Sequence, residues 1–173
     1  DIDLTAADQT TTDSSVVANF QNISAATVAG AMNVVGSAGA NVISTGAGAD
    51  TIDGGAGADV ISTGAGADTI IFHGSESSVD GGSGSDTLRI VAASGLTEID
   101  LTVAAGADQT IGDAALVSRV ENIDASALST ALRVTGSAAA EGQALLQQKQ
   151  PGGTDTEHDC RVPVKAVAKA PPR

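Results

Sequence analysis

Aspartate recurs at a fixed spacing in the middle of the chain. From Gly36 to Arg89 the sequence divides into nine-residue units: GSAGANVIS, TGAGADTID, GGAGADVIS, TGAGADTII, FHGSESSVD and GGSGSDTLR. Their sixth positions read Asn41, Asp50, Asp59, Asp68, Ser77 and Asp86, and their eighth positions read Ile43, Ile52, Ile61, Ile70, Val79 and Leu88. Carboxylate and carbonyl oxygens suit a hard divalent cation such as Ca²⁺. Because no His, Cys or Met occupies the sixth position, a soft metal is disfavoured.

This repeat resembles the G-G-x-G-x-D-x-U-x pattern of the RTX (repeats-in-toxin) family, in which several nonapeptides follow one another in strict phase. Five of the six units fit well, whereas the unit from Phe72 to Asp80 keeps only its apolar eighth position. The resemblance implies an all-β, right-handed parallel β-roll or β-helix solenoid that binds Ca²⁺ between its turns.

Within such a coil, each nonapeptide gives a turn of six residues and a strand of three, and the eighth residue points inward. Two nonapeptides complete one turn of the coil, so residues 18 apart stack on the same edge. Asp50, Asp68 and Asp86 then share one edge, where every gap between turns has a carboxylate on both sides. We expect two firm sites there, Asp50/Asp68 and Asp68/Asp86.

The opposite edge carries fewer acids at the sixth position, where Asp59 is flanked by Asn41 and Ser77. Each gap there holds one carboxylate and one neutral residue, so this edge is expected to bind weakly or to be partly empty. A metal-free β-helix with polar turns is the alternative for this edge, and a low-complexity Gly/Ala linker is the alternative for the repeats as a whole.

The glycines of the turns permit backbone angles that other residues avoid. The resemblance implies backbone ligands around Gly46, Gly48, Gly64, Gly66, Gly82 and Gly84. Ordering glycine costs roughly 0.5–1 kcal/mol more than ordering alanine, and the stacked carboxylates repel one another. We therefore expect a calcium-free state that is expanded or partly folded, and compaction when calcium binds.

Charge and composition exclude several classes of function. The 173 residues carry a net charge of −13, with a pI near 4.1, so a nucleic-acid-binding surface is not expected. The same charge argues against docking on an anionic membrane, and no apolar run is long enough for membrane insertion. Catalytic patterns such as Gly-x-Ser-x-Gly and His-Glu-x-x-His are absent, so no enzyme activity is expected. We treat the one soft-ligand cluster, His158-Asp159-Cys160, as incidental.

A second repeat, about 100 residues long, indicates the organisation of the chain. Ile2-Asp3-Leu4-Thr5 recurs as Ile99-Asp100-Leu101-Thr102, and Asp8-Gln9-Thr10 recurs as Asp108-Gln109-Thr110. All prolines and lysines lie beyond residue 140, which predicts an unrelated, disordered tail. The predicted segments are a β-solenoid flank at 1–35, the calcium β-roll at 36–89, a truncated second flank at 96–140 and the flexible tail at 141–173.

These features favour a secreted, calcium-binding structural module of a bacterial surface or exported protein. The tandem modules look like those of surface-layer and adhesin exoproteins, and the RTX resemblance implies export by a type I system. The alternative is the carrier or secretion domain of a secreted hydrolase or toxin whose catalytic part is absent. Open solenoid ends also allow self-association into a surface array or filament.

Overall fold

The chain folds into a flattened coil of short strands. The structure is a computed structural model that describes residues 2–3, 5, 21–92, 95–129 and 132–136. Every regular element in these segments is a strand and most pairings are parallel, which confirms the predicted all-β parallel solenoid. No helix able to span a bilayer occurs in the described segments. The predicted tail at 141–173 lies outside the described residues.

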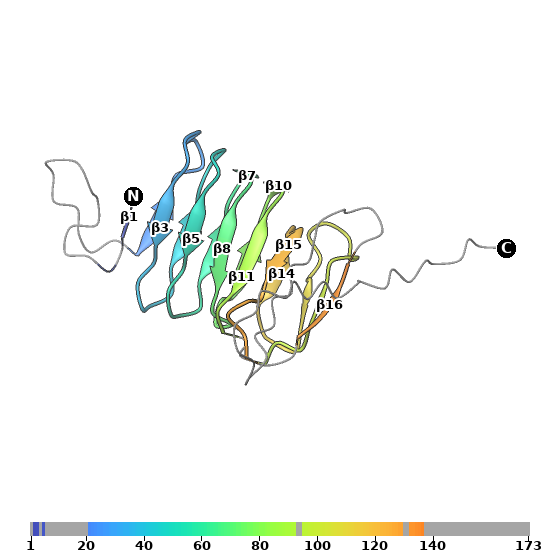
Figure 1. The fold of residues 1–173 in the computed structure, drawn as a ribbon. Helices are drawn as coiled ribbons and strands as arrows, with labels where there is room; N and C mark the ends of the chain where they lie inside the picture. Colours follow the sequence, from blue (N-terminus) through green and yellow to red (C-terminus); the bar gives the residue numbers. More distant parts are fainter. Residues whose placement is uncertain (1, 4, 6–20, 93–94, 130–131, 137–173) are drawn as a thin grey trace, which may run out of the picture.

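One face of the coil is a six-stranded parallel sheet (Figure 1). In spatial order its strands are β1 (Ile2–Asp3), β3 (Asn33–Val35), β5 (Thr51–Asp53), β8 (Thr69–Phe72), β11 (Thr87–Ile90) and β15 (Asn122–Asp124). The register pairs Val34 with Ile52, Ile52 with Ile70, and Ile70 with Leu88. Each of these steps spans 18 residues, so one coil of this block consumes two nonapeptides.

The other face is a five-stranded parallel sheet. Its strands, in spatial order, are β14 (Leu116–Ser118), β9 (Ser78–Asp80), β6 (Val60–Ser62), β4 (Val42–Ser44) and β2 (Asn22–Ser24). Here Ile43 pairs with Ile61, and Ile61 with Val79, again at intervals of 18 residues. The two sheets therefore advance along the coil at the same rate.

The core is a double row of aliphatic side chains between the sheets. Each is the central or second residue of its strand and at most 2% exposed: Val34, Ile43, Ile52, Ile61, Ile70, Val79, Leu88, Val117 and Ile123. Their neighbours face outward, so Val42 and Val60 remain 50% and 40% exposed. Burying such a side chain contributes about 1.5–3 kcal/mol. Each coil of the repeat block has only two such central positions, so its hydrophobic core is thin.

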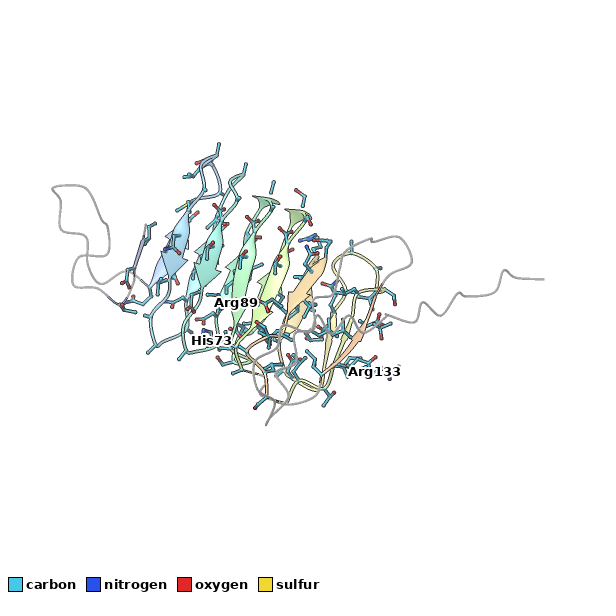
Figure 2. The ribbon with its side chains drawn as sticks, viewed as in Figure 1. His73, Arg89 and Arg133 are labelled. Carbon is cyan, nitrogen blue, oxygen red and sulfur yellow. The ribbon has the colours of Figure 1, made fainter. Side chains whose placement is uncertain are left out.

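Two rows of turns connect the sheets. We call the turns at 45–50, 63–68 and 81–86 the first edge, and those at 36–41, 54–59 and 72–77 the second edge. On the first edge, two short strands, β7 (Ala65–Gly66) and β10 (Ser83–Gly84), pair in parallel. In Figure 1 they lie at the upper ends of the coils, whereas His73 of the second edge lies at the lower ends in Figure 2. The two rows are therefore separated by the width of the sheets.

The regular coil is interrupted after β11. The chain leaves for 91–115 and returns as β14 and β15, where Val117 pairs with Val79 and Ile123 with Leu88. A separate sheet joins β12 (Glu98–Asp100), β13 (Thr110–Ile111) and β16 (Arg133–Thr135), with β12 antiparallel to β13 and parallel to β16. Of the second predicted flank, β14 and β15 thus extend the two main sheets, and the other three strands do not.

Candidate metal centre

The aspartates of the first edge form a continuous column. Oδ1 of Asp50 accepts a hydrogen bond from the backbone N–H of Met32, 18 residues earlier (2.8 Å). The same bond joins Asp68 Oδ1 to the N–H of Asp50 (2.8 Å) and Asp86 Oδ1 to the N–H of Asp68 (2.9 Å). All three aspartates are at most 1% exposed. The sequence spacing of 18 residues therefore places these acids directly above one another.

The second oxygen of each stacked carboxylate has no partner. Oδ2 of Asp50, Asp59, Asp68 and Asp86 is buried and makes no hydrogen bond in the described residues. An ionised carboxylate that is buried without compensation is strongly destabilising. A row of such oxygens, one per repeat, matches what a bridging Ca²⁺ needs, because Ca²⁺ takes carboxylate oxygens in either one- or two-oxygen coordination.

Glycine at the first position of a unit leaves room beside the free oxygen. A Cβ atom on Gly54 would lie 2.7 Å from Oδ2 of Asp59, and one on Gly81 would lie 3.0 Å from Oδ2 of Asp86. Both distances are too short for ordinary contact, so any other residue would have to displace the carboxylate. The space next to the acid is thus kept free of side chains.

The expected backbone ligands lie where successive turns touch. The carbonyl of Gly46 accepts the N–H of Ala65 (2.8 Å), and the carbonyl of Gly64 accepts the N–H of Ser83 (2.9 Å). A Cβ on Gly66 would lie 2.1 Å from the carbonyl oxygen of Gly48, and one on Gly84 only 1.5 Å from that of Gly66. Gly64, Gly66, Gly82 and Gly84 also have positive φ angles, which favour glycine. Each carbonyl oxygen retains a second lone pair that can bind a cation.

Threonine replaces the first glycine in two units of the first edge. Thr45 and Thr63 are buried, and their hydroxyls donate to the carbonyls of Thr63 (3.0 Å) and Gly81 (2.7 Å) in the following turns. These hydroxyls therefore tie adjacent turns together. Sequence reasoning treated the substitutions only as a stiffening of the backbone.

Glu121 extends the first column, although it lies outside the nonapeptides. Its Oε2 accepts the N–H of Asp86 (2.9 Å), as each aspartate does for the turn before it. Leu88 pairs with Ile123, so Glu121 is placed two residues before a core position, as Asp86 is. The turn at 119–121 contains no glycine, and Arg119 there has a φ of 53° and is ion-paired with Asp80. The glycine-rich edge therefore ends at Asp86.

Burial and like charge raise the pKa of acids on both edges. Burial raises the pKa of Asp86 to about 6, and the negative charges of Asp68, Glu121 and Asp80 add to the effect. Burial also raises the pKa of Asp59, with the charges of Glu76 and Asp53 acting in the same direction. Both acids are thus stabilised in the protonated form until a cation compensates the charge.

The second edge differs from the expected alternation of acid and neutral residue. Asp59 Oδ1 accepts the N–H of Asn41 (2.8 Å), which repeats the stacking of the first edge. Asn41 is buried and donates from Nδ2 to the carbonyl of Gln21 (2.6 Å). In the next turn, however, Ser77 is exposed and the buried side chain is Glu76, which is 3% exposed. Sequence reasoning missed Glu76 because it is one position out of phase with the other acids.

Asp53 and Asp80, expected to be solvated strand residues, have defined partners. Asp53 contacts His73 Nε2 (2.8 Å) and accepts the N–H of Gly55 (2.9 Å). Asp80 is ion-paired with Arg119 and accepts the N–H of Gly82 (3.0 Å). Both residues therefore fix the start of a glycine turn through their carboxylates.

Side chains alone do not complete a metal site in the part of the chain that the structure describes. No group of three or more His, Cys, Asp or Glu side chains is arranged there to hold a metal ion. A cation between two turns would receive a carboxylate oxygen from each turn and its remaining ligands from backbone carbonyls or water. This donor set consists only of hard oxygens, which fits Ca²⁺.

Comparison with protein families identifies the repeat block. Residues 35–70 match four copies of the RTX calcium-binding nonapeptide repeat. No curated protein and no solved structure matched the chain. The matched residues include Asp50, Asp59 and Asp68, whereas Asp86 follows in a unit that continues the same 18-residue stacking.

Proposed function

Because residues 35–70 are RTX calcium-binding nonapeptide repeats, we propose that the chain is a secreted structural module that folds when calcium binds between its turns. RTX repeats bind calcium ions and act as structural rather than catalytic units of exported proteins. The parent molecule in this proposal is a bacterial surface or exported protein, such as a surface-layer or adhesin exoprotein. Export by a type I system as an unfolded chain forms part of the same proposal.

A single observation carries the proposal, namely the row of buried aspartate oxygens without partners. One oxygen of each carboxylate holds the preceding turn through its backbone N–H, which leaves the other oxygen free for an ion. The sites that this arrangement favours are the gaps Asp50/Asp68 and Asp68/Asp86, with carbonyls of the flanking glycines as further ligands. Gly46 to Gly48, Gly64 to Gly66 and Gly82 to Gly84 are the segments that would supply them.

Coupling to folding follows from the balance of energies in each coil. The thin aliphatic core must offset the ordering of glycine-rich turns and the repulsion between stacked acids. Ions that bind only the coiled state add stability equal to RT ln(1 + [Ca²⁺]/Kd) for each site. Without calcium, the acids remain buried and uncompensated, so we expect the repeat block to lose its coil.

Far-UV circular dichroism of the chain with EDTA and with calcium, at constant ionic strength, tests the proposal. We expect a gain of strand signal and a smaller hydrodynamic radius with calcium, and neither change with an equal concentration of magnesium, because Mg²⁺ requires near-octahedral geometry and gives up its water reluctantly. An unchanged spectrum together with no bound calcium by isothermal titration calorimetry would refute the proposed function.

A further inference from the structure

The unit at 72–80 departs from the repeat pattern but keeps its place in the coil. Ser77 and Ser78 donate their N–H groups to the carbonyl of Asp59 (2.8 and 3.1 Å), so this turn stacks on the Asp59 turn. The side chain at the sixth position, Ser77, is exposed, while Glu76 is buried. A glutamate one position earlier thus replaces the aspartate that the repeat lacks, and its extra methylene extends its reach.

Asp59 has a free oxygen in this turn. Its side chain is fully buried, Oδ1 is used by the N–H of Asn41, and Oδ2 has no partner. Gly54 keeps the space beside Oδ2 free of a side chain. The two oxygens of Glu76 accept one N–H each, from His73 (2.8 Å) and Ser75 (2.9 Å), so both retain a lone pair. The Glu76 charge is close enough to contribute to the raised pKa of Asp59.

No basic side chain in the described residues is available to balance these acids. The arginines there are paired elsewhere: Arg89 with Asp124, Arg119 with Asp80 and Arg133 with Glu98. His73, the nearest basic group, is turned to Asp53.

Asp113 adds a further negative charge on the far side of Glu76. It precedes β14, whose Leu116 donates its N–H to the carbonyl of Ser77 (3.1 Å), and both of its carboxylate oxygens are buried without a partner. The second edge therefore accumulates negative charge towards the end of the coil, which increases its attraction for a cation.

We propose that Asp59 and Glu76 hold an additional calcium ion on the second edge, between the turns at 54–59 and 72–77. The remaining ligands are backbone carbonyls of these turns or water, and Asp113 strengthens binding through its charge. This inference rests on the proposed function, because it assigns the same ion to a gap that the repeat pattern leaves with one acid. It also gives the irregular unit a role other than that of a defective repeat.

The test is a calcium count by native mass spectrometry and isothermal titration calorimetry on the full chain. Asp59→Asn and Glu76→Gln are each expected to bind one calcium ion fewer than the parent chain, or to weaken one class of site at least ten-fold. Ser77→Ala is the matched control, because Ser77 occupies the regular ligand position but is exposed; its calcium count is expected to be unchanged. Asp50→Asn reports the first edge separately.

Three outcomes separate the possible explanations. Loss of an ion in Asp59→Asn and Glu76→Gln, but not in Ser77→Ala, supports the proposal. A full count in Glu76→Gln, with one ion lost in Asp50→Asn, overturns it while leaving the proposed function in place. No binding by the parent chain overturns both.

Glu76→Gln could fail to fold, because Glu76 caps the N–H groups of two residues. Circular dichroism in saturating calcium detects that case, and Asp113→Asn then replaces it, since Asp113 has no hydrogen-bond partner to lose. A weaker second-edge site in Asp113→Asn supports the proposal, whereas unchanged affinity and count in that variant overturn it.

Discussion

Asp68 is the one aspartate with a nonapeptide aspartate both above and below it on the first edge. The change Asp68→Asn retains Oδ1, which accepts the N–H of Asp50 (2.8 Å), and replaces the free oxygen Oδ2 with an amide NH₂. The column of hydrogen bonds can therefore persist while a calcium ligand is lost from both the Asp50/Asp68 and the Asp68/Asp86 gap. Asp50→Asn is the matched control, because it removes a carboxylate from only one of these gaps.

The expected magnitude follows from binding linkage. At a free calcium concentration 100 times Kd, each site adds about 2.7 kcal/mol to the free energy of unfolding. Loss of two sites in Asp68→Asn should therefore remove about 5 kcal/mol, and loss of one site in Asp50→Asn about 2.7 kcal/mol. In EDTA the sign reverses, because Asp68→Asn removes a buried, uncompensated carboxylate from between two like charges.

Urea unfolding followed by circular dichroism, in saturating calcium and in EDTA, measures both effects. Calorimetry supplies the number of ions bound by each variant. Equal losses in Asp68→Asn and Asp50→Asn would contradict the assignment of two gaps to Asp68. A loss of similar size in EDTA and in calcium would show that Asp68 acts through packing rather than through an ion.

Two further predictions concern protonation and the closeness of the turns. The pKa of Asp86 is raised by burial to about 6 from an ordinary 3.8, so its contribution to stability is complete below about 3.8 and is lost as the pH rises through about 6. In EDTA, the urea midpoint should fall between pH 4 and pH 7.5, while calcium affinity should rise; a midpoint that rises in EDTA contradicts this. In saturating calcium, Gly84→Ala should cost well over 2 kcal/mol, because its Cβ would lie 1.5 Å from the carbonyl oxygen of Gly66. Gly106→Ala, which also has a positive φ but nothing within 4 Å, should cost about 1 kcal/mol; equal costs by urea unfolding would show that turn stacking is unimportant.

The sequence by itself determines the regular part of the coil. Its period of nine residues is also the structural period, so counting residues is enough to place Asp50, Asp68 and Asp86 in one column and Ile52, Ile70 and Leu88 in one row. The composition of the repeat likewise indicates the ion, because glycine carbonyls and aspartate carboxylates are hard oxygen ligands.

Tertiary structure alone decides which residues join this pattern out of phase. Glu121 continues the first column 35 residues after Asp86, because the chain leaves the coil at 91–115 and returns with a shortened turn. Glu76 is buried on the second edge in place of Ser77, because the turn at 72–77 bends to place its glutamate against the N–H groups of His73 and Ser75. Neither contact has a periodic spacing; each depends on how a particular loop closes, which residue counting does not specify.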